Sequence, residues 1–446
     1  MSIQAISTKI ISTLGNKESL VPIILKDGVD SASLTYKSFK EGGPVEGKDR
    51  AIDEFGTQAI WVGGIPFYKK LFDMTAYKAA KLNPQVDVRV TTNPEYSAWA
   101  IDNAKGLMNN SKTQTVKSAI TDCLVDGGKK AQNTYKGKII AATALTLLTY
   151  FGLTKFKQNQ TKKNVMEEIN NDSYTKSKDF SNLKNNNDNK VFSDIVSFKG
   201  LNPKKVSDAI MFNPVHNMKI IDAGITTERL ACSRNKTELC EHAIKEGGFL
   251  FFLYGFGNYL EKGISKFANK VLNKPIDLDI DVLTDETFSK ALSSGKLAED
   301  LTKLPAKTSS LTDKLNFLVD NPDNAVVKAA KKSKIISTVK DEAGKSVIDT
   351  SKFIDVNEVE KLADNLSNIS EKFAASSDNV KGFLNKTKAL KVGSVVANIG
   401  ISCFVLGYVI PQAVYKYREW KTGTTSFHVE NDIKNNPNNN KKPQNV

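Results

Sequence analysis

Residues 42–49 of this chain read GGPVEGKD, which has the G-x-x-x-x-G-K spacing of a phosphate-binding loop. In such a loop backbone amides and a lysine hold phosphate, a following Ser or Thr hydroxyl binds magnesium, and a hydrophobic strand comes before. Here Asp49 stands where the hydroxyl is needed and would repel phosphate, and the preceding SLTYKSFKE is not such a strand. We therefore expect a turn at this position and no bound nucleotide.

A second group of reactive side chains lies around residue 240. Cys240, Glu241 and His242 are adjacent, and Cys232 lies eight residues earlier. A zinc site needs four ligands that converge on one point, whereas neighbouring residues of a helix point about 100° apart. A Cys–His nucleophilic pair would lack an orienting group and an oxyanion hole. The sequence thus predicts no metal and no cofactor, and it favours a protein that is not an enzyme without deciding the matter.

Two pairs of opposite charges have spacings at which salt bridges form. Arg50 and Glu54 are four residues apart, and Glu228 and Arg229 are adjacent. Charged pairs of this kind are usually solvated, so we expect these four side chains to lie in water.

The composition limits the classes of protein to which the chain can belong. Its 446 residues are 40% hydrophobic and 25% charged, with a mean hydropathy of −0.33, so membrane spans must be few. The net charge of +14 fits either an anionic membrane surface or a simply solubilising exterior. The lysines are spread along the chain without interleaved aromatic residues, so we expect no nucleic acid. Four cysteines without CxxC spacing, and no secretory signal, predict soluble parts in the cytoplasm.

The clearest apolar segment, 391–415, predicts a transmembrane helix. Residues 392–415 contain no charge over 24 positions, and about 20 apolar residues suffice to span a bilayer. Aromatic and basic side chains at its exit are typical of the headgroup layer, and the membrane-interface residues predicted here are Tyr415, Lys416, Tyr417, Arg418 and Trp420. The alternative is a buried core helix.

Small residues recur on one face of this segment. Gly393, Gly400 and Gly407 are each seven residues apart, and Ala397 lies on nearly the same face. Such a face lets another helix approach closely, and Asn398 would hydrogen-bond across the contact. We expect helix packing at these five residues, with a protein partner, a second copy or the segment around 139–156. Chance placement of glycine is the alternative.

A second transmembrane helix is predicted at 137–156. Its uncharged run, IIAATALTLLTYFGL at 139–153, is near the lower limit of length for a span. Lysines flank both this segment and 391–415 almost symmetrically, so the positive-inside rule gives no orientation.

Two shorter uncharged stretches, 55–68 and 247–260, are rich in glycine and aromatic residues. They fit half-embedded or re-entrant segments, and equally buried core strands or helices. Their surroundings resemble each other, because Gly64-x-x-x-Tyr68 is matched by Gly255-x-x-x-Tyr259, and a longer apolar segment follows in each half. This suggests an internal duplication, either of an anchoring module or of a transporter repeat with paired interrupted segments. None of the four stretches contains Asp, Glu or Arg, which speaks against an ion relay.

The remaining sequence predicts helical regions in water. Asp355 and Glu358 have capping-box spacing, and apolar residues follow at steps of three and four to Phe373. Asn321-Pro322 predicts another helix start. The predicted boundaries are 1–136 for an N-terminal helical region, 137–156 for a transmembrane helix, 157–190 for a flexible Asn/Lys-rich linker, 191–270 for the second half, 271–390 for a helical region, 391–415 for the main transmembrane helix and 421–446 for a disordered tail.

The sequence therefore predicts a mainly α fold of helical bundle-like domains, held in a membrane with anionic lipid. The leading hypothesis is a membrane-anchored structural or interaction protein. The alternatives are a small transporter or channel built from two related halves, and a soluble enzyme of a type that the sequence does not reveal.

Overall fold

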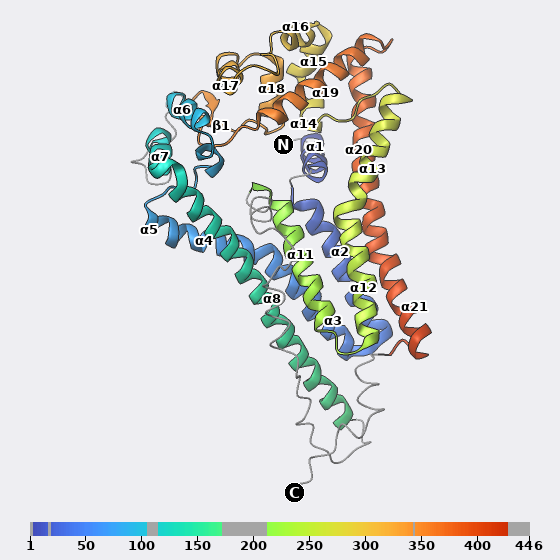
Figure 1. Cartoon of the computed structure of the whole chain (residues 1–446). Helices are drawn as coiled ribbons and strands as arrows, with labels where there is room; N and C mark the ends of the chain where they lie inside the picture. The colour runs from blue at the N-terminus through green and yellow to red at the C-terminus, as the bar shows by residue number, and fades with distance from the viewer. Residues whose placement is uncertain (1–2, 17–18, 105–114, 172–211, 342–343, 427–446) are drawn as a thin grey trace. The chain divides into compact units, whose positions relative to one another are not determined.

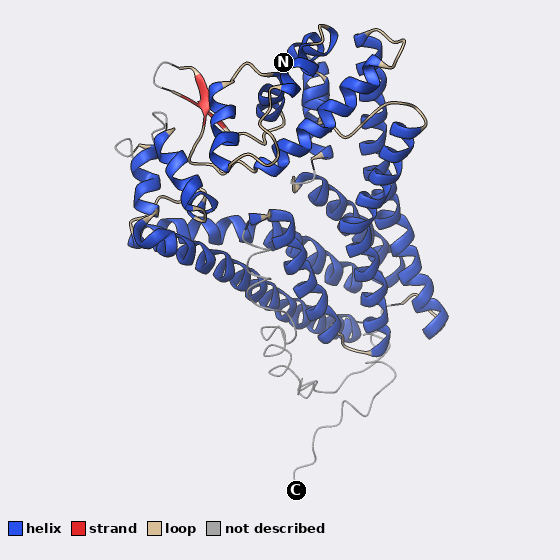
Figure 2. Cartoon of the chain, turned by 45° about the horizontal axis from the view of Figure 1, so that its top comes forward, coloured by secondary structure: helices blue, strands red, loops and turns tan. Residues whose placement is uncertain are grey.

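The computed structural model describes residues 3–16, 19–104, 115–171, 212–341 and 344–426 (Figure 1). The predicted mainly α fold is confirmed, because helices make up most of this part of the chain. Figure 2 shows one hairpin among the described residues, formed by β1 (Thr338–Lys340) and β2 (Ser346–Ile348). The two strands are antiparallel, with Val339 opposite Val347.

The chain forms two compact units, and each is assembled from three separate segments. Unit 1 comprises residues 1–17, 70–138 and 259–397, and unit 2 comprises 18–69, 139–258 and 398–446. The boundaries predicted from the sequence follow the chain from end to end, so they do not coincide with units of this kind.

Unit 2 is a bundle of helices. Its elements are α2 (Val21–Lys37), η1 (Ser38–Gly42), α3 (Gly43–Ala59), η2 (Ile60–Gly64), α11 (Pro214–Ala231), α12 (Lys236–Leu250), η6 (Phe251–Gly255), η7 (Val405–Val409) and α21 (Ile410–Thr422). Side-chain caps begin two of them: Asn213 accepts hydrogen bonds from the backbone of α11, and Asn235 from that of α12. Helix α2 packs on α3, and α12 packs on both α11 and α21 (Figure 1).

The two short Gly/aromatic stretches are helical, and each contains a π-helical turn. These turns are η2 and η6, and each interrupts a longer helix. A π turn contains one residue more than an α turn, which shifts the side chains that follow it around the helix. Their entry into a membrane stays a prediction.

Unit 1 consists of shorter helices and the hairpin. Its elements are α1 (Ile3–Gly15), η3 (Asp73–Tyr77), α5 (Lys78–Ala80), η4 (Val88–Thr91), α6 (Pro94–Asp102), α7 (Val116–Cys123), η5 (Val125–Gly128), α14 (Ile280–Leu283), α15 (Glu286–Ser293), α16 (Lys296–Thr302), α17 (Leu311–Asp320), α18 (Ala325–Lys332), α19 (Val356–Ala374), β1 and β2.

Helix α19 contains the stripe that the sequence predicts. Asp355 caps it by accepting a hydrogen bond from the Asn357 amide, and the apolar residues at steps of three and four are buried up to Ile369. The predicted helix start at Asn321-Pro322 is wrong by one turn. Asn324 is the N-cap, and α18 begins at Ala325, because the Asn324 side chain accepts from the Val326 amide.

Four helices begin in one unit and end in the other: α4 (Ile65–Phe72), α8 (Lys129–Asn171), α13 (Phe256–Lys270) and α20 (Val380–Phe404). Among the described residues, two helical stretches are long and apolar enough to cross a membrane, Val125–Asn164 and Val380–Thr422. They contain the two segments predicted as spans. The predicted linker at 157–190 begins as helix, since α8 continues to Asn171. The rest of that linker, and residues 427–446 of the predicted tail, lie outside the described residues.

Candidate functional site

Charged side chains fill the part of unit 2 that lies beyond its apolar core. The core contains Trp61, Tyr150, Phe249 and Leu406 among other apolar residues. Next to it on α3 come Glu46, Asp49, Arg50, Asp53 and Glu54, and on α12 come Glu238, Glu241, His242, Lys245 and Glu246, all of them buried. This group, with Arg229, Arg418 and Lys157, is called the buried ion network below. Burying a charge is costly unless it is paired, so the pairings decide whether the arrangement is stable.

Arg418 of α21 joins the two helices that carry most of the network. Its side chain is 0% exposed. Nε donates to Oε1 of Glu241 at 2.7 Å, and Nη1 donates to Oε2 of Glu46 at 2.6 Å. Nη2 contacts the second oxygen of each carboxylate at 2.8 Å, so both pairs are bidentate. The Tyr415 hydroxyl donates to Glu46 at 2.8 Å. One guanidinium thus bridges α3 and α12.

Arg229 and Lys245 form a second centre. Nζ of Lys245 lies 2.7 Å from Oε1 of Glu54, and Arg229 contacts Glu246 and lies 3.3 Å from Asp53. Burial opposes ionisation of Glu246, but Arg229 and Lys245 outweigh it and lower the pKa of Glu246 to about 2. Burial and Arg229 oppose protonation of Lys245, yet Glu246 and Glu54 raise its pKa above the usual range. Glu246 and Lys245 are therefore charged at neutral pH.

A third centre contains His242 from the group around residue 240, together with Arg234, Glu238 and Asp49. Arg234 pairs with Glu238 at 2.5 Å and with Asp49 at 3.3 Å. His242 Nε2 lies 3.7 Å from Glu238, and burial lowers the pKa of His242, which favours the neutral imidazole. His242 therefore faces Glu238. In the described part of the chain, no three His, Cys, Asp or Glu side chains converge in a metal-binding geometry.

A polar cavity of about 20 Å³ lies where the ion network meets the apolar core. Its lining residues are Asp27, Glu54, Thr57, Trp61, Asp222, Ile225, Arg229, Lys245, Glu246 and Phe249. Trp61 Nε1 donates to Asp222 at 2.9 Å, and the Tyr254 hydroxyl donates to the same carboxylate. Burial raises the pKa of Asp222 to about 7. The volume is sufficient for about one water molecule, with several polar partners.

The predicted helix-packing residues have different surroundings. A Cβ on Gly407 would lie 2.8 Å from Val29, so α2 approaches closely there. At Gly393 and Gly400 no described atom lies within 4 Å of such a Cβ. Ala397 is half-buried. The closest approach on this face is therefore to α2, and packing at Gly393 and Gly400 stays a prediction.

Asn398 has a partner that the sequence did not identify. Its Oδ1 accepts a hydrogen bond at 3.2 Å from Nζ of Lys26, and Lys26 also lies 3.5 Å from the Phe252 carbonyl oxygen in η6. Lys26 is 3% exposed. The expected amide contact across helices thus joins α20 to α2 through a buried lysine.

The predicted membrane-interface residues divide into two sets. Tyr415 and Arg418 are buried in the ion network, whereas Trp420 is 78% exposed. Lys416 is exposed, and Tyr417 is half-buried with its ring 6.0 Å from that of Trp420. The outer set keeps the aromatic and basic character that the prediction requires, although contact with lipid is untested.

The expectation that the pairs Arg50/Glu54 and Glu228/Arg229 are solvated is wrong, because all four side chains are buried. The spacing of the charges offered a signal for this. Charged residues recur at steps of three and four on α3 (46, 49, 50, 53, 54) and on α12 (238, 241, 242, 245, 246). Such a stripe, placed before an apolar stretch, marks one face of a helix.

Comparison of the chain with known protein families, with curated proteins and with solved structures gives no match.

Proposed function

We propose that this protein is a membrane-anchored structural or interaction protein. The observation that supports the proposal is the exposure of its two apolar helical stretches. Only 33% of the apolar window in Val125–Asn164 and 28% of that in Val380–Thr422 is buried within the chain. The core helix of a soluble protein would bury most of such a window. An uncovered apolar surface of this size needs lipid or another protein over it.

The side chains that cover these helices agree with lipid as that partner. Large apolar residues are exposed along both stretches: Ile140, Leu148 and Phe156 on α8, and Val396, Ile401, Phe404, Tyr408 and Val409 on α20 and η7. The charges of the buried ion network in unit 2 point inward instead. Ionisable side chains of membrane proteins face the interior of the bundle and pair there.

The end of the second stretch suits a membrane surface. Trp420 and Lys421 are exposed, and the Lys421 ammonium lies 5.6 Å from the centre of the Trp420 ring. An exposed indole beside lysine is typical of the headgroup layer, and cations there favour anionic lipid. We place the soluble parts in the cytoplasm because of the free cysteines in the described residues.

Extraction of membranes with carbonate, compared with extraction by detergent, tests this function. We expect the protein to stay in the pellet at alkaline pH and to dissolve only in detergent. Replacing exposed apolar residues of α20 (Val396→Lys together with Phe404→Lys) should release it, because a lysine at mid-membrane costs about 2.5 to 3.5 kcal/mol. Trp420→Lys is the control that should leave the protein in the pellet. Release of the wild-type protein by carbonate would refute integration and favour a soluble enzyme.

A second candidate, a small transporter or channel built from two related halves, is favoured by the polar cavity. Three of its lining residues, Thr57, Trp61 and Phe249, come from the paired short stretches 55–68 and 247–260. No acidic residue lies within those stretches, but Asp222 reaches Trp61 from α11, and Lys26 reaches Asn398 from α2. Binding sites of repeat-built transporters lie between their halves.

A duplication that relates the two halves is supported by one observation: several corresponding features of the halves are separated by the same number of residues. The π turns η2 and η6 lie 191 residues apart, as do Gly64 and Gly255. Two ion pairs join residues with the same separation: Arg50 lies 3.6 Å from Glu241, and Glu54 lies 2.7 Å from Lys245. Contact between equivalent positions is expected where two related copies meet about an approximate two-fold axis.

Accessibility of the cavity separates the second candidate from the first. A cysteine at Thr57, which lines the cavity, should react with a membrane-impermeant thiol reagent if a water pathway exists. In an anchoring protein the same cysteine should stay unlabelled above the wild-type background until detergent is added. If the cysteine at position 57 is not labelled while the protein is in the membrane, a water pathway to the cavity is excluded.

A further inference from the structure

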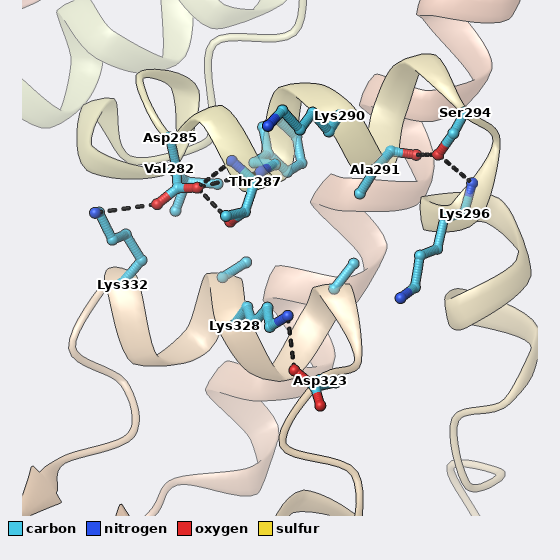
Figure 3. A pocket seen from close by; sticks show the side chains of 13 residues that line it. Val282, Asp285, Thr287, Lys290, Ala291, Ser294, Lys296, Asp323, Lys328 and Lys332 are labelled. Carbon is cyan, nitrogen blue, oxygen red and sulfur yellow. Dashed lines mark hydrogen bonds and ion pairs between the residues drawn. The ribbon is translucent and has the colours of Figure 1, made fainter. Parts of the chain in front are cut away.

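Helices α15 and α18 of unit 1 face each other across a pocket of about 300 Å³ (Figure 3). Apolar side chains form much of its lining: Val282, Phe288, Ala291, Ala325 and Ala329. All five are buried, so the inner surface of the pocket is fixed by the core of the unit. This volume lies at the lower end of the range for small-molecule sites, which are mostly apolar with a few converging polar groups.

The charged residues around this apolar lining are mainly lysines. Lys290 and Lys296 border it on the α15 and α16 side, and Lys328 and Lys332 border it on α18 (Figure 3). The carboxylates that line it are Asp285 and Asp323. Four lysines against two carboxylates leave the pocket with an excess of positive charge.

The two carboxylates already have partners. Asp285 accepts hydrogen bonds from the backbone amides of Thr287 at 2.7 Å and Phe288 at 3.2 Å, and it pairs with Lys332 at 3.0 Å. Burial opposes its ionisation, but hydrogen bonds from Thr287 and Lys332 lower the pKa of Asp285 to about 2. Asp323 pairs with Lys328 at 2.9 Å. Asp285 is thus engaged by its own partners, and Asp323 mainly by Lys328, with a weaker attraction to Lys296.

Lys290 and Lys296 are both exposed, and neither has an ion-pair partner among the described residues. A lysine presents a mobile point charge on a long apolar stem, so it attracts an anionic head group without fixing the geometry of that group. The rim thus offers two unpaired ammonium groups above an apolar surface. A ligand that uses both features must carry an anionic head and an apolar body.

We propose that this pocket binds a small carboxylate with an apolar body, of the class of free medium-chain fatty acids. Its head group contacts Lys290 and Lys296, and its chain lies on the surface formed by Phe288, Ala291 and Ala329. Charge alone would hold acetate as well, and apolar contact alone would hold a fatty alcohol. The combination selects the amphiphilic anion.

Calorimetric titration of the full-length protein in nanodiscs of zwitterionic lipid tests the proposal, with empty nanodiscs subtracted. The probes are octanoate, acetate and octanol. We expect saturable octanoate binding at least about tenfold tighter than that of either acetate or octanol, since each lacks one of the two interactions. Acetate binding as tightly as octanoate would overturn the proposal, and so would equal binding of octanol.

Removal of the two rim lysines provides the matched test. Lys290→Ala with Lys296→Ala should weaken octanoate binding by roughly fivefold, because exposed charge contacts are individually weak. The fold should be unaffected, since both side chains are exposed. Lys303→Ala with Lys361→Ala removes two exposed lysines elsewhere in unit 1 and should leave the affinity within about twofold. Equal loss in both double variants would refute a specific site, as would unchanged binding in the first.

Discussion

The two units of this protein distribute charge in opposite ways. Unit 1 has an apolar interior, with Leu366 and Val326 fully buried, and places ion pairs such as Lys307–Asp364 on its surface. Unit 2 buries Arg418 between Glu46 and Glu241 and leaves Phe404 and Ile401 uncovered. Arg418 and Phe404 of unit 2 thus take positions opposite to those of Lys307 and Leu366 in unit 1.

If unit 2 lies in a membrane, as proposed above, the difference matches each unit to its own surroundings. In water, apolar residues are driven inward and charges stay outside at little cost. Where an apolar surface is covered by lipid, polar groups find partners only inside the protein, and each must be paired there. The comparison yields four predictions, which follow from the largest expected effect to the smallest.

Removal of Arg418 should give the largest effect. Arg418→Met keeps much of the volume but leaves Glu46 and Glu241 buried without their shared cation, which costs about 3 to 5 kcal/mol. Thermal unfolding in detergent, followed by circular dichroism, measures the loss. Arg418→Lys should recover only part of the stability, because an ammonium cannot serve two carboxylates bidentately. A melting temperature equal to that of the wild type would show that Glu46 and Glu241 do not depend on Arg418 as their buried cation.

Truncation of a large apolar residue should have unequal effects in the two units. Leu366→Ala in unit 1 leaves a cavity in a close-packed core and should cost about 2 to 5 kcal/mol. Phe404→Ala should cost far less, because Phe404 is 60% exposed and contributes little to the interior. Thermal unfolding in detergent, followed by circular dichroism, compares the losses of stability in the two variants. A larger loss for Phe404→Ala would mean that this face packs on protein.

The sequence predicted the mainly helical class and the stripe of α19, because the signals for these are local. The stripe of α19 and the cap at Asp355 depend on spacing within a few residues, and both are present in the structure. The predicted start of α18 is wrong because Asn321 and Asn324 are both good caps, and the Asp300 carboxylate favours the later one by accepting a hydrogen bond from the Ala325 amide. The division into two units could not be predicted from the sequence, because it depends on contacts between segments hundreds of residues apart.

The ion network was missed for a related reason. A charge stripe on a helix shows that the charges share one face, but it does not show which opposite charges they will meet. Only the tertiary fold brings Arg418 to Glu46, which is 372 residues away. The partner of Asn398 was equally hidden, because Lys26 lies far earlier in the chain and has no sequence signal of its own. Which polar side chains pair with each other is therefore decided only when the helices of unit 2 have packed together.

The pH dependence of stability should reveal the cavity carboxylate. Because burial raises the pKa of Asp222 to about 7, the folded state keeps a proton that the unfolded state releases near pH 4. The stabilisation from Asp222 is therefore complete below about pH 4 and is lost as pH rises through about 7. Asp222→Asn should reduce the difference in unfolding free energy between pH 5 and pH 8 by about 1 to 3 kcal/mol. An unchanged pH profile would contradict the assignment.

Removal of a surface ion pair from unit 1 should give the smallest effect and completes the comparison. Lys307 and Asp364 are 67% and 61% exposed at the side chain, although Nζ lies only 3.0 Å from the carboxylate. Water already solvates both groups, so Lys307→Ala should change the free energy of unfolding by less than about 1 kcal/mol, and salt should abolish even that. Arg418→Met should remain costly in high salt, because ions do not reach a buried pair. Similar losses for the two variants would mean that burial does not separate the two units energetically.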